Sequence, residues 1–367
     1  MYASPEPRRY RGAIIGLGNV ARQSHVPAYR LEPAASRLTL AAVCEPAPHT
    51  VPPVDVALVR NLFDLSELVG PLDFVDICTP TGTHLDLTLA CLERGWHVLC
   101  EKPVATTRAE ADYLRRAAAR AGRVVMPCHQ YRYNPAWRQM RAWLDAGTIG
   151  RWHLAELDVY RAHADRGNDK RPVPWRARAA AARGGVLLDH GTHLVYELLD
   201  LAGAPAAVRA WTGRLRHRDY DVEDSAHLLL EYPERLARIF LTWGGPRREA
   251  KVRFVGELGT IEWVGGILML ERGGITECFD YSAELDKTAY ARWYADLFSD
   301  FAAALDGGTT APLDDITAVA DVLDAAYRSA ASGGVATAPG GPPATPASAQ
   351  SGKRRSRKEP VRKARVR

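Results

Sequence analysis

The run Gly12-Ala13-Ile14-Ile15-Gly16-Leu17-Gly18-Asn19-Val20-Ala21 decides the fold of the N-terminal part of the chain. Its apolar start predicts a buried strand, and the G-x-G-x-x-A pattern from Gly16 to Ala21 predicts a tight turn into a helix. The first glycine permits the turn, the second lets the backbone approach a pyrophosphate, and the small alanine lets the helix pack closely on the strand. The pattern therefore predicts a dinucleotide site, with an ordinary strand–helix turn as the alternative.

The following segments repeat this alternation of short apolar runs and helical spacing. We expect strands at residues 38–44, 74–78, 97–100 and 123–127, and helices at residues 84–93 and 109–121. Strands that alternate with helices form βαβ units, which give a parallel sheet. Residues 10–128 are therefore predicted to form an α/β domain that binds a dinucleotide, after a loose leader at residues 1–9.

The pattern changes after residue 128, because strand-like runs now follow one another with turn signals between them. We expect strands at residues 151–160, 225–232, 236–243, 251–255, 259–264, 267–271 and 275–281, and helices at 135–146, 184–202, 289–305 and 316–331. This order is typical of an open, mainly antiparallel sheet, so residues 129–332 are predicted to be a second, α+β domain. Residues 333–367 are predicted to be a disordered linker and a basic tail.

The composition is that of a globular protein, with 47% apolar and 25% charged residues among 367. The net charge of +5 comes from residues 353–367, which carry +8 and leave the rest at −3. The charge therefore gives no argument for nucleic-acid binding outside the tail. The six cysteines show neither disulfide nor zinc spacing, and no stretch resembles a signal peptide or a membrane span. We expect a cytoplasmic protein with free thiols.

The acidic residue Glu45 ends the second predicted strand, 24 residues beyond Ala21 and near the spacing of about 20 in dinucleotide-binding patterns. A carboxylate at this place accepts hydrogen bonds from the adenosine ribose and repels a 2′-phosphate. The next four residues, Pro46-Ala47-Pro48-His49, include no Arg or Lys that could receive such a phosphate. NAD is therefore predicted over NADP. The alternative is that Glu45 ends the strand in solvent.

The tripeptide Glu101-Lys102-Pro103 follows another predicted strand. The carboxyl ends of parallel strands are where ligands bind, and Pro103 favours an extended Lys102. A lysine beside a bound cofactor can act as an acid or a base. The alternative for this short motif is a solvated pair of charges in a loop.

A third candidate is the run Gly184-Gly185-Val186-Leu187-Leu188-Asp189-His190-Gly191-Thr192-His193. Asp189 and His193 are four positions apart, so a helix would place them on one face, where the carboxylate could orient the imidazole for catalysis. The two glycines would let the start of the helix lie close to a ligand. The alternatives are a histidine satisfied by its neighbour, and a metal set of Asp189, His190 and His193, which lacks a further ligand at useful spacing. We therefore predict no metal.

These segments together resemble the glucose–fructose oxidoreductase / inositol 2-dehydrogenase / rhizopine-catabolism (Gfo/Idh/MocA) family of pyridine-nucleotide oxidoreductases, from about Arg11 to Gly334. Residues 76–84, DICTPTGTH, are similar to the family's P-x-x-x-H loop, and residues 95–103, GWHVLCEKP, to its most diagnostic signature. Gln130-Tyr131-Arg132-Tyr133-Asn134-Pro135 and Trp175-Arg176 match recurring family segments. The resemblance implies a Rossmann domain followed by a sheet domain that often forms homodimers or homotetramers, with the last helix packed back on the first domain.

The resemblance also implies roles for single residues. Lys102 handles the proton of the substrate hydroxyl, Asp189 and His193 complete the catalytic set, and Glu101 contacts the nicotinamide ribose. The expected cofactor path includes Thr79, Pro80 and His84, and the residues expected to help hold cofactor or substrate are Gln130, Arg132 and Arg176. Tyr160, His163 and Trp175 are candidates for binding a sugar, with core or interface packing as their alternative.

Two residues depart from the family pattern. Arg183 stands where the family often has the first of three glycines, and Tyr196 stands where it often has an acidic residue, three positions after the histidine. Tyr196 puts the usual contacts around His193 in question. Arg183 is predicted to be either a specificity feature or a side chain facing solvent.

The expected function is hydride transfer between NAD and a secondary hydroxyl or ketone of a sugar, sugar derivative or cyclic polyol. Two alternatives remain open. A glycoside hydrolase would need NAD only in catalytic amounts, and a dinucleotide-binding sensor would have no turnover, which the presence of Lys102, Asp189 and His193 argues against. The basic tail could bind nucleic acid through phosphates. Removing residues 335–367 is predicted to leave turnover unchanged.

Overall fold

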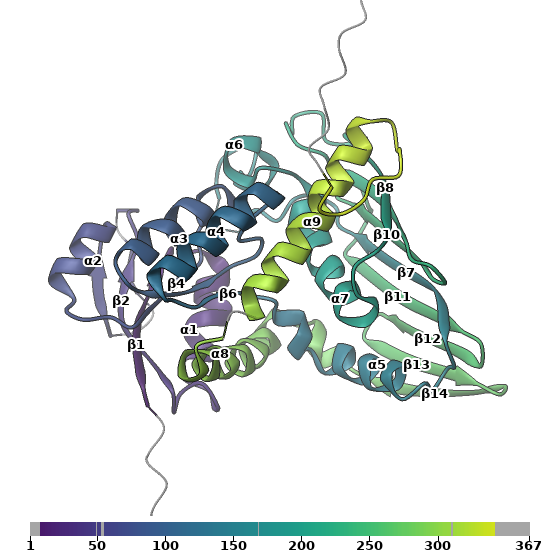
Figure 1. Cartoon of the computed structure of the whole chain (residues 1–367), viewed down its shortest axis with the longest axis horizontal. Coiled ribbons are helices and arrows are strands. Elements are labelled where there is room, and N and C mark those ends of the chain that lie inside the picture. The colour runs from purple at the N-terminus through teal and green to yellow at the C-terminus, as the bar shows by residue number, and fades with distance from the viewer. Residues whose placement is uncertain (1–7, 49, 53–54, 168, 310, 342–367) are drawn as a thin grey trace, which may run out of the picture.

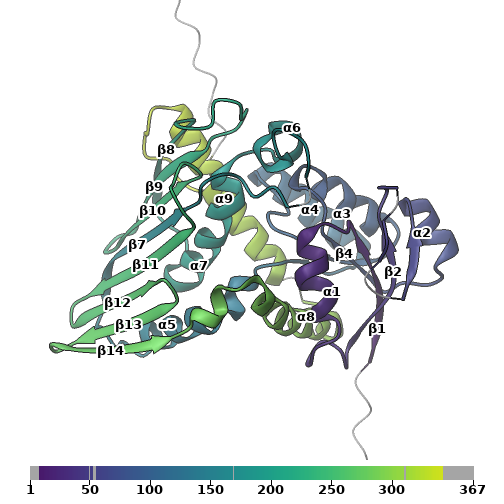
Figure 2. The ribbon, with the colours of Figure 1, turned by 180° about the vertical axis from the view of Figure 1, so that it is seen from behind.

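The chain forms two sheets joined by long helices. The computed structural model describes residues 8–48, 50–52, 55–167, 169–309 and 311–341. In Figure 1 the N-terminal sheet lies on the left in purple and blue, the second sheet lies on the right in teal and green, and α9 (Ala311–Ala331) runs between them. Figure 2 shows the same arrangement from behind. The predicted class, a parallel sheet followed by a mainly antiparallel one, is confirmed.

The N-terminal sheet has six parallel strands in the order β3-β2-β1-β4-β5-β6. The strands are β1 (Tyr10–Ile15), β2 (Leu38–Cys44), β3 (Ala57–Val59), β4 (Phe74–Ile77), β5 (His97–Cys100) and β6 (Val125–Pro127). The strand order reverses between β1 and β4, and dinucleotides bind at such a switch point in doubly wound sheets. The sequence analysis missed β3 and the helix α2 (Leu62–Leu68), which are both short.

Helices from both ends of the chain cover this sheet. The helices α2, α3 (His84–Glu93) and α4 (Arg108–Ala121) pack on one face, together with the start of α9. The other face is covered by a π-helical turn (Ala21–His25), by α1 (Val26–Ala28), and by α8 (Tyr290–Gly307). From α8, Phe298 and Phe301 are fully buried and contact Tyr29 and Phe74, with ring centroids 4.5 and 5.5 Å apart. The core of the N-terminal sheet thus includes residues that follow the second sheet in the chain.

The second sheet has eight strands in the order β14-β13-β12-β11-β7-β10-β9-β8. The strands are β7 (Trp152–Tyr160), β8 (Ala207–Gly213), β9 (Ser225–Glu231), β10 (Leu236–Thr242), β11 (Glu249–Gly256), β12 (Gly259–Val264), β13 (Ile267–Arg272) and β14 (Ile275–Asp280). It is not a simple meander, because β7 lies between β10 and β11 and is parallel to β10. The carboxyl ends of β7 and β10 therefore lie side by side at the same end of the sheet.

Three helices bury one face of this sheet: α5 (Pro135–Asp145), α7 (Thr192–Ala202) and the second half of α9. The strands alternate accordingly, so that Ala155, Leu157 and Val159 of β7 are buried while Glu156 and Asp158 are not. Shorter elements are a π-helical turn (Leu187–Gly191), α6 (Ala179–Ala182), and 3-10 turns at Thr81–Thr83, Gln130–Tyr133, Trp175–Ala177, Ser282–Leu285 and Lys287–Ala289.

The start of the predicted linker differs from the structure. Val208 of β8 and Thr337 exchange two backbone hydrogen bonds of 2.9 Å, and the Ser329 hydroxyl donates to the carbonyl oxygen of Val335 at 2.7 Å. These hydrogen bonds help to offset the loss of conformational entropy on ordering, which was the reason for predicting a disordered linker from the composition. The basic tail and residues 1–7 of the predicted leader lie outside the described residues. No helix in the described part of the chain is long and apolar enough to span a membrane.

Candidate active site

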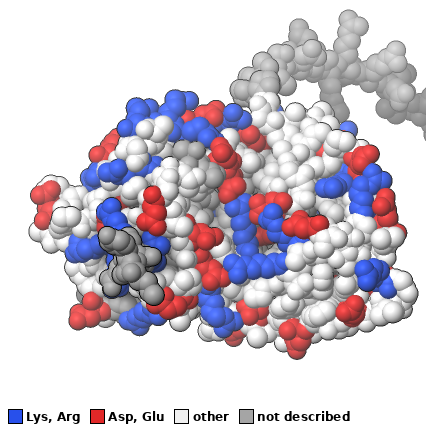
Figure 3. Space-filling view, turned by 60° about the horizontal axis from the view of Figure 1, so that its bottom comes forward, with Lys and Arg blue, Asp and Glu red and all other residues white. Residues whose placement is uncertain are grey.

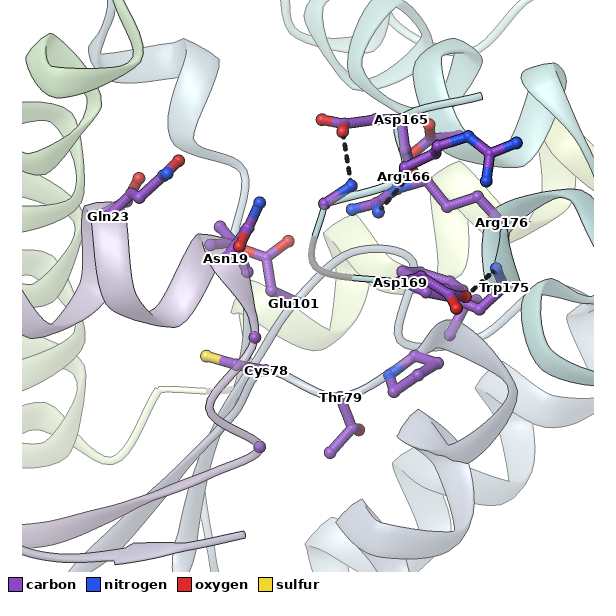
Figure 4. Close-up of a pocket in the computed structure, with 18 of the residues that line it drawn as sticks. Asn19, Gln23, Cys78, Thr79, Glu101, Asp165, Arg166, Asp169, Trp175 and Arg176 are labelled. Atoms are coloured by element: carbon purple, nitrogen blue, oxygen red, sulfur yellow. Dashed lines mark hydrogen bonds and ion pairs between the residues drawn. The ribbon is translucent and has the colours of Figure 1, made fainter. Parts of the chain in front are cut away.

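A cavity of about 1020 Å³ lies between the two halves of the molecule. Loops at the carboxyl ends of β1, β2, β4 and β5 line one side, and loops that follow β7 and β10 line the other. In Figure 4, Asn19, Thr79 and Glu101 lie across the space from Asp165, Arg166, Asp169, Trp175 and Arg176. Figure 3 shows Lys and Arg side chains gathered where the two halves meet. The cavity therefore draws its walls from both predicted domains.

The Gly-rich turn takes the predicted strand–turn–helix form. Gly16 has a φ of +91°, and a Cβ there would lie 2.8 Å from Thr79 Cγ2, so both the turn and the close approach to β4 require glycine. A Cβ at Gly18 would meet no atom within 4 Å, and Gly18, Asn19 and Val20 line the cavity. Ala21 is fully buried and packs the helix on the sheet. The open space beside Gly18 is thus available to a ligand.

Glu45 lies at the same end of the cavity and holds the turn. Its Oε2 accepts the N–H of Leu17 at 2.7 Å, and its Oε1 accepts the N–H of Ala47 at 3.0 Å. The sequence analysis found no cation beside Glu45 in the chain, but Arg60, just after β3, donates from Nη1 to the carbonyl oxygens of Glu45 and Ala47, at 3.0 and 2.6 Å. Only the pairing of β3 with β2 brings Arg60 there, so the local sequence gave no sign of it.

A buried network fixes Glu101. The ring of His25 joins two carboxylates, with Nδ1 2.8 Å from Asp76 Oδ2 and Nε2 3.0 Å from Glu101 Oε1. Burial acts to lower the pKa of His25, but Asp76 outweighs it, so this pKa lies well above its usual value. Burial likewise acts to raise the pKa of Glu101, but His25 holds that pKa below its usual value. Tyr294 of α8 donates to Glu101 Oε1 at 2.5 Å. Glu101 is therefore held as a carboxylate.

Two cysteines lie beside this network. Ligand atoms of His25, Asp76 and Cys78, and of His25, Glu101 and Cys128, lie within 4.8 Å of one another in each group. However, both imidazole nitrogens already bond to carboxylates, and burial raises the pKa of both thiols, which keeps them protonated. Among the described residues this set is better suited to holding Glu101 than to holding a metal ion.

His84 ties together the two loops that frame the cavity floor. Its Nε2 lies 2.8 Å from the carbonyl oxygen of Thr79, and its Nδ1 lies 2.9 Å from the carbonyl oxygen of Pro103. Burial lowers the pKa of His84. Thr79, Pro80 and His84 all line the cavity, as the family resemblance implies.

Lys102 and Asp189 meet across the cavity, one from each half of the molecule. Lys102 Nζ donates to the main-chain oxygen of Asp189 at 2.5 Å and lies 3.4 Å from Asp189 Oδ1. Arg176 Nε lies 3.5 Å from the same Oδ1. Burial acts to raise the pKa of Asp189, but the neighbouring His190, Lys102 and Arg176 hold it well below its usual value. Asp189 is therefore an ionised partner of Lys102.

His193 lines the cavity, but the expectation that Asp189 orients its ring is wrong. The partner of His193 Nδ1 is the hydroxyl of Tyr196, at 3.0 Å, and this hydroxyl also accepts the N–H of Tyr131 at 3.1 Å. The Tyr131 ring stacks on the imidazole with centroids 4.2 Å apart. Burial foremost, and then the charge of Lys102, lower the pKa of His193 well below its usual value, so the ring is neutral.

The glycines before this segment also act differently from the prediction. A Cβ at Gly185 would lie 1.9 Å from the carbonyl oxygen of Glu223, and one at Gly184 would lie 2.4 Å from the Tyr327 hydroxyl. Neither glycine lines the cavity. Glu223, which the sequence analysis missed, accepts the N–H of Leu187 at 3.2 Å and the Tyr327 hydroxyl at 2.8 Å. The glycines thus permit close packing of protein on protein.

Three further residues lie away from the cavity. Tyr160, predicted to bind substrate, packs on Phe240 at the open face of the second sheet. Arg132, predicted to hold cofactor or substrate, pairs with Asp200 at 2.6 Å and with Asp315 at 2.5 Å. Arg183 pairs with Glu110 of α4, and its φ of 66° explains why glycine is common at its place in the family.

The remaining predicted residues line the cavity, and so do several that the sequence analysis missed. Predicted residues on the lining include Gln130, His163, Trp175 and Arg176. Missed residues include Tyr131, Arg161, Arg248 and Tyr290. The position of Arg161 directly after a predicted strand was the one available signal among these, because ligands gather at strand ends.

The fold and the cavity define a class, that of proteins with a dinucleotide-type Rossmann sheet facing a second sheet domain across a shared cleft. Comparison with known families places the chain within it. The profile described as "Oxidoreductase family, NAD-binding Rossmann fold" matches residues 10–129, and that of the GFO/IDH/MocA C-terminal domain matches residues 137–262. The chain belongs to the GFO/IDH/MocA family, and the resemblance read from the sequence is confirmed.

Curated relatives include the NADP⁺-dependent scyllo-inositol 2-dehydrogenase IolW of Bacillus subtilis, 28% identical over 186 residues, which are 51% of this chain and 50% of that protein. The D-glucoside 3-dehydrogenase of Escherichia coli is 31% identical over 203 residues, 53% of this chain and 55% of that protein. The matches thus span about half the length of these relatives. The structure of levoglucosan dehydrogenase with NADH and levoglucosan has a TM-score of 0.76, covers 91% of this chain and 100% of that one, and, at 20% identity, shows the shared fold.

Proposed function

We propose that the protein is a nicotinamide-dependent oxidoreductase that acts on a secondary hydroxyl or ketone of a sugar, sugar derivative or cyclic polyol. The observation that carries this proposal is the contact of Lys102 with Asp189 in the cavity that the Gly-rich turn also lines. The sugar and inositol dehydrogenases among its relatives support the substrate class. The same contact argues against a sensor without turnover, which would have no use for a lysine held in this way.

The residues of the first half fit a dinucleotide. Gly18 faces open space, the N–H groups at the start of the following helix can bind phosphate, and Glu45 stands where a ribose carboxylate acceptor is expected. When bound, the nicotinamide supplies the hydride chemistry. Gly16, Gly18, Asn19, Val20 and Glu45 would hold its adenosine and phosphates, and Thr79, Pro80, Glu101, Gln130 and Arg176 would hold the nicotinamide end.

Lys102 is proposed to carry the proton. Its Nζ has three donor positions, of which two point to Asp189. The third position has no partner among the described residues, so it is free to meet a substrate oxygen. In reduction the ammonium gives the proton at this position to the oxygen; in oxidation the neutral amine holds its lone pair there and takes the hydroxyl proton, becoming the ammonium. Asp189 positions the amine by accepting these two bonds.

His193 is proposed to donate a hydrogen bond rather than to relay the proton. Tyr196 is fully buried, and its oxygen already accepts the N–H of Tyr131, so its own hydrogen finds its partner in His193 Nδ1. A neutral ring that accepts at Nδ1 carries its hydrogen on Nε2. Nε2–H can then donate to the substrate oxygen while Lys102 moves the proton. Tyr196 thereby takes over the orienting task expected of an acidic residue.

We propose NAD rather than NADP as the cofactor. Glu45 keeps lone pairs free for ribose hydroxyls, and Arg60 is already bonded to two carbonyl oxygens. A Glu45→Gln variant retains an oxygen acceptor but loses the charge. We expect it to lose NAD affinity relative to NADP; an unchanged ratio of the two dissociation constants would remove this part of the proposal.

The remaining expectations stay proposals of the same kind. We propose that residues 10–128 hold the cofactor, that residues 129–332 hold the substrate and make a homodimer or homotetramer, and that the protein works in the cytoplasm. The basic tail is proposed to be dispensable for turnover.

The decisive experiment identifies any dinucleotide that copurifies with the protein by mass, then follows NAD reduction over a panel of sugars and polyols. Lys102→Ala is expected to lower the rate by about 10²–10⁴-fold. Lys251→Ala serves as the matched control, because Lys251 pairs with Glu262 on the second sheet and does not line the cavity. Full activity of Lys102→Ala would refute the assigned role, and a need for NAD in catalytic amounts only would favour the glycoside hydrolase.

A further inference from the structure

Two arginines of the second half share one wall of the cavity. Arg161 follows β7 directly, and Arg248 directly precedes β11. The pairing of β7 with both β10 and β11 brings them together, and the backbone N–H of Arg161 donates to the carbonyl oxygen of Thr242 at 2.8 Å. The strand topology therefore places both guanidinium groups on the same side of the cleft.

Both side chains are anchored, yet among the described residues neither has a carboxylate within ion-pair distance. Arg161 Nη1 donates to the carbonyl oxygens of Tyr160 and Glu249, at 2.7 and 2.9 Å. Arg248 Nη2 donates to the Tyr290 hydroxyl at 3.1 Å. No ion pair within the described residues involves either arginine, and the same holds for Arg166 and Lys170 of this cavity. Other cations of the cavity do pair, including Arg171 with Asp169, Arg176 with Asp189, and Lys287 with Asp165.

The two positive charges act on each other and on the residues beside them. Burial foremost, and also the charge of Arg248, lower the pKa of Arg161, while Tyr131, Tyr290 and the Asp189 carboxylate act to raise it. Both charges oppose the rise that burial causes in the pKa of Tyr131. Arg161 is half-buried, Arg248 is exposed, and both line the cavity. An anion bound between them would be attracted by both charges and would offset their mutual repulsion.

Enough donors remain to bind such an anion. Each guanidinium has five N–H groups, and the described residues use two of Arg161 and one of Arg248. The planar fork of arginine matches the two oxygens of a carboxylate or a phosphate. The site therefore has both the charge and the geometry to recognise an anionic group.

The wall lies beside the proposed reaction centre. Tyr290, which holds Arg248, lies 6.5 Å from Tyr131 between ring centroids, and Tyr131 stacks on His193 at 4.2 Å. The second half approaches the Gly-rich turn at Gly167, where a Cβ would lie 3.2 Å from Asn19 Nδ2. Gly167, rather than Arg161 or Arg248, thus approaches the part of the cavity where cofactor phosphates are expected.

We propose that Arg161 and Arg248 form a subsite for an anionic group of the substrate, a carboxylate or a phosphate. The substrate class is then an acidic or phosphorylated sugar rather than a neutral one. This inference rests on the proposed function for its chemistry. The subsite itself can be tested by the binding of an anion, without turnover.

The test compares a hexuronate, the hexose 6-phosphate and the matching neutral hexose, with the protein saturated with NAD. We expect a KM at least about tenfold lower for one of the two anions than for the neutral sugar. Arg248→Gln is expected to raise the KM of that anion by about 10–100-fold, to leave the KM of the neutral sugar in place, and to leave NAD affinity unchanged. Arg247→Gln is the matched control, because Arg247 is exposed like Arg248 but pairs with Glu249 and does not line the cavity.

The outcome for each sugar decides a separate question. A preference for the uronate identifies a carboxylate, and a preference for the phosphate ester identifies a phosphate. Equal KM values for all three sugars, unchanged in Arg248→Gln, overturn the subsite. If no sugar reduces NAD, the proposed function fails, and calorimetric titration of the NADH-loaded protein with the hexuronate and with inorganic phosphate still tests the subsite. Binding that Arg248→Gln abolishes supports it, and the absence of binding overturns it.

Discussion

The hydroxyl of Tyr196 is the most informative single group to remove. It joins His193 Nδ1 and the backbone N–H of Tyr131, at 3.0 and 3.1 Å, in a fully buried place. Tyr196→Phe keeps the ring but leaves both groups without a partner. At about 1–3 kcal/mol for each of these two unpaired groups, we expect the free energy of unfolding in urea to fall by about 2–6 kcal/mol. Tyr133→Phe is the control, with an expected loss of about 1 kcal/mol, because the Tyr133 hydroxyl bonds to Asp300 near the surface.

The same variant tests the orientation of His193, which stability alone cannot report. In protein labelled with ¹⁵N at histidine, long-range proton–nitrogen spectra distinguish a ring protonated on Nε2 from one protonated on Nδ1. Spectra of His193→Gln identify the signal. We expect the Nε2–H form in the parent protein and a mixture of both forms in Tyr196→Phe. An Nδ1–H form in the parent protein would refute the reasoning, since the Tyr196 oxygen would then have to accept two hydrogen bonds and leave its own hydrogen unpaired.

Three further predictions concern stability and the cofactor site. Burial foremost lowers the pKa of His129 well below its usual value, so below pH 6.5 only the unfolded state takes up this proton and the free energy of unfolding decreases as the pH is lowered. Urea titrations from pH 6.5 to 4.5 should show this decrease to be smaller in His129→Gln, by up to about 1.4 kcal/mol per pH unit. Phe298→Ala should lower the free energy of unfolding by about 3–5 kcal/mol, while Phe63→Ala, at an exposed site, should change it by less than about 0.5 kcal/mol. A loss in Phe298→Ala as small as that in Phe63→Ala would show that α8 is not part of the core. Gly16→Ala places a Cβ 2.8 Å from Thr79 Cγ2 at a φ of +91°, so calorimetry should show weakened NAD binding, and unchanged affinity would contradict the close approach.

The sequence predicted most of the secondary structure, because local patterns determine it. The expected strand at residues 38–44 and the expected helix at residues 84–93 coincide with β2 and α3. The parallel pairing of β7 with β10 could not be predicted in this way, because it joins segments about 80 residues apart and no local pattern encodes it. The antiparallel pairing of β7 with β11, in which Tyr160 lies opposite Glu249, likewise joins distant segments and brings Arg161 and Arg248 together, so the charged wall of the cavity also escaped the sequence analysis.

The relation of Asp189 to His193 shows a different limit. Four positions place two residues on one face of an α-helix, but residues 187–191 form a π-helical turn, in which the hydrogen bonds reach one residue further. The face therefore shifts within the segment, and Asp189 meets Lys102 while His193 meets Tyr196. The position of Tyr160, by contrast, could have been predicted, since strand alternation puts it on the same face as Glu156 and Asp158.

The covering of the N-terminal sheet by α8 has a consequence for how the chain folds during its synthesis on the ribosome. The chain is made from its N-terminus, yet Tyr294, Phe298 and Phe301, which seal one side of the first sheet, are added only after the last strand of the second. The last strand of the first sheet, β6, is therefore made about 170 residues before these side chains, and in that interval the π-helical turn and α1 cover this apolar face of the sheet only in part. Exposed apolar surface of this kind makes a growing chain prone to aggregation until α8 is in place.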